Sequence, residues 1–239
     1  MLRAVLFDWG HTLMNWTADD EILRDAHRAG LEALAREDVP DADSVAEYFR
    51  LRYEELFAPA ALDEVEYPGI VRALLGEFGV AVTDEELGRY LEAEHAALVP
   101  ARQVGATTHA LLDSLRARGL RTGLVSNAFD PPWLLHRGLE QLGIAQRLDV
   151  AVFSSEVGKR KPHPEIFGRA LTVLGVEPAE AVFVGDSLFH DIRGASQLGM
   201  TTVQALWFRV DDNPDGAEPD FQAFTPFDVL NFAERLVAA

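Results

Sequence analysis

Short runs of consecutive apolar residues alternate with helical patterns through most of this chain, and this alternation restricts the fold more than any other feature. The apolar runs have the length of strands and cover residues 4–7, 122–125, 150–153, 181–184 and 202–206. The helical patterns cover residues 109–118, 132–142, 164–174 and 191–198. Because strands that are apolar throughout are buried on both faces, the pattern predicts an α/β fold with a doubly wound, Rossmann-like parallel sheet.

Residues 16–99 interrupt this alternation. Apolar residues there recur at helical spacing without an intervening strand. Breaks in the helical pattern fall near Pro40, Pro59, Pro68 and Gly79. We therefore expect an all-helical cap domain at residues 16–99, inserted into an α/β core that comprises residues 1–15 and 100–239.

The composition narrows the classes of partner. A formal net charge of −18 disfavours binding to nucleic acids and to anionic membranes, because both partners are polyanions. The chain has no cysteine, which excludes disulfides and thiolate metal sites, and it has no apolar stretch long enough to span a bilayer. We expect a cytoplasmic protein without a nucleic-acid or membrane partner, and the sequence leaves the oligomeric state open.

Polar side chains follow four of the expected strands at the point where each strand ends. They are Asp8 after the first strand, Ser126 and Asn127 at the second, Lys161 a short loop beyond the third, and Asp186 and Asp191 after the fourth. In an open parallel sheet, ligands bind outside the carboxyl ends of the strands. A single aspartate there is commonly a turn former or helix cap. Carboxylates, a hydroxyl and an ammonium together predict a site for a divalent cation and a phosphate.

Lysine is rare in this chain. Among its 21 basic residues only Lys159 and Lys161 are lysines, and both lie in the segment GKRKPHP. Genomic base composition explains this bias as well as a functional need does, and for Lys159 it is the preferred explanation. The functional alternative is that one position requires a compact ammonium, which a planar guanidinium does not replace.

Four segments carry a resemblance to a known family. They are FDWGHTL, LVSNAF, GKRKPHPEIF and VFVGDSLFHDIRGASQLGM. In sequence and order they resemble the motifs of the haloacid dehalogenase-like hydrolase superfamily, in its phosphatase branch with a helical cap inserted after the first motif. The resemblance covers nearly the whole chain, and it implies a phosphatase that acts on a small phosphorylated metabolite.

The resemblance assigns a nucleophile and a metal site. Asp8 would attack phosphorus and form an aspartyl-phosphate, which water later opens. The carboxylates of Asp8 and Asp186 and the backbone carbonyl of Gly10 would hold Mg²⁺ as the cofactor.

The remaining roles concern the phosphate and the support of the site. Ser126 and the backbone N–H of Asn127 would hold the phosphoryl oxygens, and Lys161 would neutralise charge in the transition state. Asp191 would orient Lys161 or a metal-bound water, and Thr12 would hold the Asp8 loop. The helical insertion would act as a lid that excludes water and supplies specificity.

The segment Asp8-Trp9-Gly10 departs from the family pattern. Phosphatases of the family carry Asp-x-Asp, where the second aspartate protonates the leaving oxygen and then activates water. General acid–base catalysis contributes about 10²–10⁴-fold, so the glycine should slow hydrolysis of alkyl phosphates more than of acyl or aryl phosphates. His11 is an alternative acid, although a simple loop role is preferred for it.

Loss of that carboxylate leaves several functions to compare. Haloacid dehalogenases lack the arrangement of Asp186 and Asp191, which argues against halide chemistry. Phosphonate hydrolases of the superfamily use a cap lysine, and the insertion has none. The remaining alternatives are a phosphatase that obtains its proton elsewhere and a protein that has lost turnover and only binds a phosphorylated ligand or a partner.

Five further side chains are candidates for the substrate side of the site. Arg24, His27 and His95 could face it from the cap, although surface exposure or packing is the usual role of such residues on amphipathic helices. Trp16 and Trp133 flank motif segments, and for both of them core packing is preferred over a position at the mouth of the site.

Overall fold

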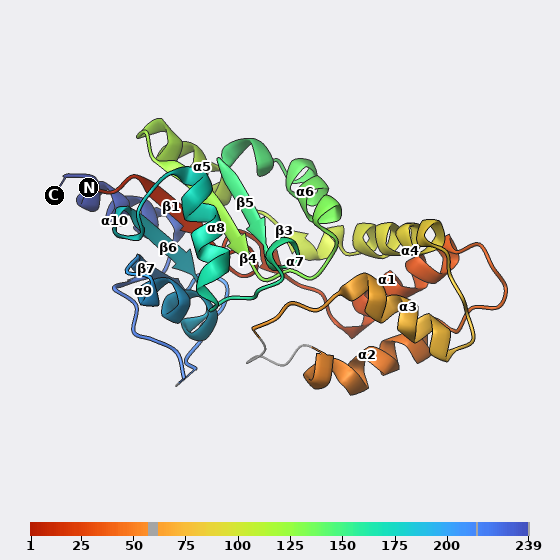
Figure 1. Cartoon of the computed structure of the whole chain (residues 1–239). Coiled ribbons are helices and arrows are strands. Elements are labelled where there is room, and N and C mark those ends of the chain that lie inside the picture. Colours follow the sequence, from red (N-terminus) through yellow and green to blue (C-terminus); the bar gives the residue numbers. More distant parts are fainter. Residues whose placement is uncertain (57–61, 214, 239) are drawn as a thin grey trace.

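The computed structural model describes residues 1–56, 62–213 and 215–238, and its centre is a six-stranded sheet with the order β5-β4-β1-β6-β7-β8 (Figure 1). The strands are β1 (Ala4–Phe7), β4 (Arg121–Ser126), β5 (Val150–Phe153), β6 (Ala181–Gly185), β7 (Thr201–Ala205) and β8 (Phe221–Ala223). All neighbouring pairs are parallel. The predicted α/β fold with a doubly wound parallel sheet is therefore confirmed.

Helices cover both faces of this sheet. Residues of α5 (Ala106–Ala117), α6 (Pro132–Gln141) and α10 (Pro226–Ala238) form one apolar cluster, and residues of α8 (Pro164–Leu174) and α9 (Gly194–Gln197) form another. Strand β1 contributes alternately to the two clusters, since Val5 and Phe7 belong to the first and Ala4 and Leu6 to the second. This burial on both faces is the physical reason why the strand is apolar at every position.

Four helices connect β1 to the second half of the core: α1 (Asp20–Ala33), α2 (Ala42–Leu56), α3 (Tyr67–Glu77) and α4 (Asp84–Ala97). Asp19 caps α1 and Thr83 caps α4, whereas Pro68 lies in the first turn of α3, where a missing N–H costs nothing. The helices enclose an apolar cluster of their own, which Leu134 of α6 joins. The predicted helical cap is confirmed. The break expected at Pro59 lies outside the described residues.

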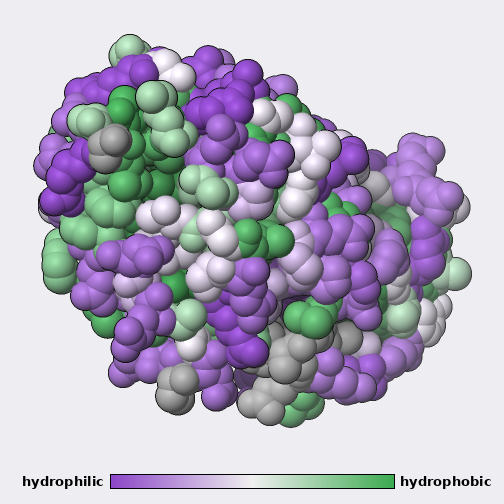
Figure 2. All heavy atoms as spheres, turned by 60° about the vertical axis from the view of Figure 1, so that its left-hand side comes forward, coloured by the Kyte–Doolittle hydropathy of each residue, from purple (hydrophilic) through white to green (hydrophobic). Residues whose placement is uncertain are grey.

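The two connections between cap and core run side by side. They form a short antiparallel pair of β2 (Asn15–Trp16) and β3 (Arg102–Gln103), which the sequence did not indicate. The cap extends to one side of the core in Figure 1, and Figure 2 shows an indentation in the outline between a larger and a smaller lobe. The domain boundaries at residues 15/16 and 99/100 remain predictions.

Some elements differ from the expected ones. The helical pattern at residues 191–198 is a π-helical segment (Leu188–Arg193) followed by the short helix α9. Strand β8 and helix α10 were not predicted from the sequence, although both belong to the core. Among the described residues, no helix has the length and apolar character needed to cross a membrane.

Candidate active site

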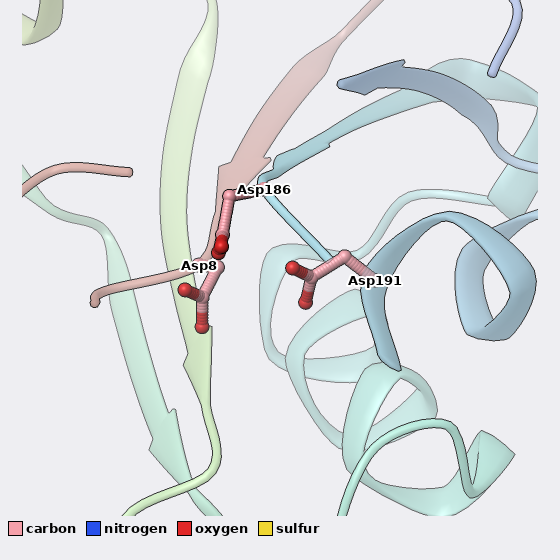
Figure 3. Close-up of side chains that lie close together, drawn as sticks. All are labelled: Asp8, Asp186 and Asp191. Carbon is pink, nitrogen blue, oxygen red and sulfur yellow. The ribbon is translucent and has the colours of Figure 1, made fainter. Parts of the chain in front are cut away.

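Three aspartate side chains converge at the carboxyl edge of the sheet (Figure 3). Asp8 follows β1, Asp186 follows β6, and Asp191 lies in the π-helical segment after β6. The parallel register that pairs Phe7 with Val184 brings the ends of β1 and β6 together, and Asp8 N donates to Val184 O over 2.9 Å. All three carboxylates are buried, with ligand oxygens within 4.8 Å of one another.

Lys161 lies among these carboxylates. Its Nζ is 2.5 Å from Asp8 Oδ1 and 2.6 Å from Asp191 Oδ1, and the residue is only 2% exposed. Asn127 positions its backbone, because Asn127 Oδ1 accepts from Lys161 N over 2.7 Å. Asp191 is fixed in turn by Ser187, whose N–H donates to Asp191 Oδ2 over 3.0 Å. The side chain expected to orient Lys161 is therefore in contact with it.

The site carries more negative than positive charge. Burial raises the pKa of Asp186 to about 8, with repulsion from Asp191 and Asp8 adding to the effect. Burial also raises the pKa of Asp8 to about 6, although Lys161 opposes this. Burial disfavours the ammonium of Lys161, but attraction to Asp191 and Asp8 outweighs it and raises the pKa of Lys161.

The donor set fits a hard divalent cation. Asp186 Oδ2 is buried and accepts no hydrogen bond within the described part of the chain. Arg209 Nη2 lies 2.5 Å from that oxygen, but the two groups are not aligned for a hydrogen bond and their contact is an ion pair. Clustered carboxylate oxygens are the ligands that Mg²⁺ prefers. A bound cation would relieve the repulsion among them.

Arg209 was not predicted from the sequence as a site residue. It lies in the loop after β7, and its side chain is 48% exposed. Its position beyond the end of a core strand was the available signal. The same loop supports the nucleophile, because Trp207 Nε1 donates to Thr12 O over 3.0 Å. The hydroxyl of Thr12 has no hydrogen-bond partner among the described residues, so Thr12 contacts this loop through its carbonyl.

Position 10 has room for a side chain. Apart from the two flanking residues, no atom in the described part of the chain lies within 4 Å of the place where a Cβ on Gly10 would be, and Gly10 does not adopt a left-handed backbone conformation. The fold would therefore accept an aspartate at position 10, and lack of space does not explain why a glycine stands there. His11 follows with a left-handed backbone, φ 56°, and burial together with Arg209 lowers its pKa. Its proposed role as a substitute acid remains a prediction.

A cavity of about 410 Å³ lies between these loops and the cap. Gly10, Ser126 and Asn127 line its core side. On the cap side lies the buried Glu94, whose Oε1 is 2.7 Å from His27 Nδ1. Tyr67 Oη is 2.9 Å from both oxygens of Glu94, and burial raises the pKa of Tyr67 well above its ordinary value, so this hydroxyl remains a donor.

The substrate-side candidates have different positions. His27 lines the cavity, whereas Arg24 pairs with Asp43 and His95 contacts Arg102. Trp16 lines the cavity and packs against the core, so both roles considered for it are combined. Trp133 is 46% exposed, so the prediction that it packs in the core is wrong. Helical spacing did not reveal these differences, because it does not say which neighbour covers each face.

Comparison with known proteins identifies the family. The haloacid dehalogenase-like hydrolase model matches residues 2–199. The chain is 32% identical over 241 residues to a glyceraldehyde 3-phosphate phosphatase of Methanopyrus kandleri, with 99% of each chain covered. It is 37% identical over 115 residues to a phosphoserine phosphatase of Thermus thermophilus, a match that covers 47% of this chain and 44% of the relative.

Solved structures give the same result. A HAD phosphatase from Thermococcus onnurineus superposes with a TM-score of 0.64 at 25% identity, covering 97% of each chain. A 2-haloacid dehalogenase from Pseudomonas syringae pv. Tomato superposes with a TM-score of 0.71 at 22% identity, over 99% of this chain and 100% of that one, which shows a shared fold. The chain belongs to the haloacid dehalogenase-like hydrolase family, and the predicted enzyme class, a hydrolase of its phosphatase branch, is confirmed.

Proposed function

We propose that this protein is a Mg²⁺-dependent phosphohydrolase that dephosphorylates a small metabolite through an aspartyl-phosphate on Asp8. The observation that carries the proposal is the contact of the buried Lys161 with both Asp8 and Asp191. A buried ammonium against the attacking carboxylate reduces repulsion between that carboxylate and an anionic substrate. The phosphatase names of the relatives agree with this chemistry.

The metal would be held by Asp8, Asp186 and the carbonyl of Gly10, and when bound it would neutralise charge on the carboxylates and on the phosphoryl oxygens. The protein groups would perform the chemical steps. An Asp8 oxygen attacks phosphorus while the bond to the leaving oxygen breaks, and the leaving group departs with the electron pair. Water then attacks the aspartyl-phosphate, which releases inorganic phosphate and restores Asp8.

Ser126 and Asn127 would bind the phosphoryl group during these steps. Both line the cavity beside Gly10, at the carboxyl end of β4. Asn127 has a second function in this account, because its side chain holds the backbone of Lys161 through Oδ1. The phosphate-binding segment and the charged lysine are therefore coupled, and movement of one would displace the other.

A phosphatase assay tests the proposal. We expect hydrolysis of p-nitrophenyl phosphate and acetyl phosphate in Mg²⁺, loss of activity in EDTA, and a loss of about 10⁴-fold or more in Asp8→Asn. Asp113→Asn, an exposed aspartate on α5 whose side chain is 56% accessible, is the matched control and should retain activity. Activity that survives EDTA or the Asp8→Asn exchange would refute the proposal.

Gly10 supports a second candidate, a protein that binds a phosphorylated ligand or a partner without turnover. The vacant space at position 10 means that no side chain there transfers a proton. Turnover of a metabolite at ordinary enzymatic rates, about 1 s⁻¹ or faster, would exclude this candidate. Halide release from 2-haloacids in the same assay series would test the less favoured dehalogenase, against which the Asp186 and Asp191 carboxylates argue.

A further inference from the structure

The cavity beside the proposed nucleophile has mainly apolar walls, to which five aromatic side chains contribute. Tyr67 and Phe129 face one another across cap and core with ring centroids 4.8 Å apart, and Phe49 lies 5.9 Å from Tyr67. Trp9 and Trp16 form part of the core-side wall. The volume of about 410 Å³ is within the range of small-molecule sites and exceeds the needs of a phosphoryl group alone. The remainder of the cavity is available to a leaving group.

The charged groups in the wall disfavour an anionic leaving group. Glu94 is 4% exposed, and its hydrogen bonds come from Tyr67 and His27. Arg102 also lines the cavity, but its charge is compensated by Asp130 at 3.6 Å. A carboxylate on the substrate would meet Glu94 in a medium of low dielectric constant, where repulsion is strong.

A polyhydroxylated leaving group fits this wall poorly as well. Each hydroxyl that enters an aromatic cavity loses its bonds to water and requires a protein partner. The polar groups on the cap side are already bonded to one another, since Tyr67 donates to Glu94 and Glu94 also contacts His27. An uncharged aromatic ring, in contrast, would be buried against aromatic side chains without leaving polar groups unpaired.

The missing carboxylate at position 10 points to the same class of leaving group. Without a proton donor the leaving oxygen departs as an anion, so its basicity determines the rate. A phenol has a pKa of about 10, whereas an aliphatic alcohol is closer to water at about 15.7. In the step itself, Asp8 forms a bond to phosphorus, the aryl–oxygen bond to phosphorus breaks, and the phenolate leaves with the electron pair and takes a proton from water.

From the apolar, partly aromatic cavity and the vacant position 10 together, we propose that the substrate is a monoaryl phosphate whose uncharged ring fills the cavity between cap and core. The proposal rests on the phosphohydrolase function proposed above and specifies its substrate class. It separates this chain from relatives whose names give glyceraldehyde 3-phosphate or phosphoserine as the substrate.

Three phosphate monoesters test the substrate class with the wild-type protein in Mg²⁺. Phenyl phosphate has a ring and a weakly basic leaving oxygen, benzyl phosphate has a ring and an alkoxide leaving group, and glycerol 3-phosphate has an alkoxide leaving group and no ring. We expect kcat/KM to fall in that order, with phenyl phosphate about 10²-fold or more above glycerol 3-phosphate. Equal or better hydrolysis of glycerol 3-phosphate would overturn the inference while leaving the phosphohydrolase function intact.

Binding of phosphonates, which have no ester bond to hydrolyse, tests the selectivity of the cavity independently of catalysis. Calorimetry in Mg²⁺ should show that phenylphosphonate binds about 10-fold or more tightly than methylphosphonate, because its ring is buried. Should no ester be hydrolysed, the phosphohydrolase function fails, and this ratio still decides whether the cavity selects an aromatic ring. Equal affinities would overturn the inference.

A matched pair of cap variants tests where the aromatic ring of the ligand binds. Leu23 lines the cavity and is 39% exposed, so Leu23→Trp should narrow the cavity without overpacking the interior. We expect it to reduce the phenyl-to-methyl affinity ratio by about 10-fold. Leu51→Trp places the same ring on a cap residue that is 67% exposed and outside the cavity wall, and it should keep the wild-type ratio. An unchanged ratio in Leu23→Trp would contradict the proposed position of the ring.

Discussion

Two buried carboxylates, Asp186 in the core and Glu94 in the cap, have different surroundings. Asp186, on the core side, lies among other carboxylates, and its Oδ2 forms an ion pair with Arg209 but accepts no hydrogen bond from the described residues. Glu94, on the cap side, accepts hydrogen bonds from Tyr67 and contacts His27. The Glu94 carboxylate therefore has its hydrogen-bond partners within the cap. The carboxylates around Asp186, in contrast, repel one another, and a bound cation would relieve this repulsion.

This difference agrees with the separate roles of core and cap in the proposed mechanism. The core side must bind a metal and a phosphoryl group, and ligand sites of this kind retain unsatisfied polar atoms. The cap side must exclude water from the cavity and receive the leaving group, for which a mainly apolar wall with paired polar groups is suitable. Three substitutions test the comparison.

The largest effect is expected from Lys161→Arg. The two carboxylates lie 2.5 and 2.6 Å from a buried ammonium, and a guanidinium is larger and planar. We expect kcat for p-nitrophenyl phosphate to fall by about 10²–10³-fold although the charge is retained. Lys159→Arg is the control, because Lys159 forms an ion pair with Asp63 near the surface. Similar losses in both variants would show that the compact ammonium at position 161 has no special role.

The cap side is tested by Tyr67→Phe, which removes the two contacts of 2.9 Å to Glu94. Because the carboxylate stays buried, we expect the free energy of unfolding to fall by about 1.5–3 kcal/mol in a urea titration. The control Tyr48→Phe removes a surface hydroxyl that accepts from Arg52 Nη1 over 2.6 Å and lies 3.5 Å from Glu77, and it should change stability by less than about 0.5 kcal/mol. A Tyr67→Phe protein as stable as the control would mean that Glu94 does not depend on this hydroxyl.

A smaller effect, with a defined pH dependence, is expected from Asp186→Asn in EDTA. The raised pKa of about 8 means that the folded protein binds more protons than the unfolded chain between pH of about 4 and 8, so the metal-free wild type loses stability as pH rises through this range. The amide does not titrate. The variant should therefore melt above the wild type at pH 8.5 and lose this advantage at pH 5, with about 2–4 °C for each kcal/mol of repulsion removed.

The exposed Asp113→Asn exchange is the control for this titration and should show no advantage that grows with pH. Melting curves of both variants and the wild type at pH 5 and pH 8.5 are sufficient. If Asp186→Asn is less stable than the wild type at pH 8.5, the core-side carboxylates are not in repulsion, and the contrast with Glu94 is wrong.

The sequence predicted the core side of the site much better than the cap side. Asp8 and Asp186 follow strands whose apolar runs are unambiguous, and parallel strands necessarily place their ends at the same edge of the sheet. The bounds of β1, β5 and α8 agree with the expected residues for the same reason. Here a local pattern determines the three-dimensional position.

The cap wall could not be predicted in this way. Glu94 and Tyr67 are separated by 27 residues, and Glu94 and His27 by 67, so their contact depends on how three helices pack. Helical periodicity identifies a buried face but not the neighbour that covers it. Arg209 escaped for a related reason, because its loop returns to Asp186 from beyond β7.

The substitution Gly10→Asp tests the central claim, that this site works without the second carboxylate, most directly. The open space at position 10 means that the variant should fold without strain, so its activity can be compared with that of the wild type. In Mg²⁺ we predict that kcat/KM for glycerol 3-phosphate rises by about 10²-fold or more, whereas the value for phenyl phosphate changes much less. An active wild type in which Gly10→Asp brings no gain on glycerol 3-phosphate would contradict the claim, because another group would then supply the proton.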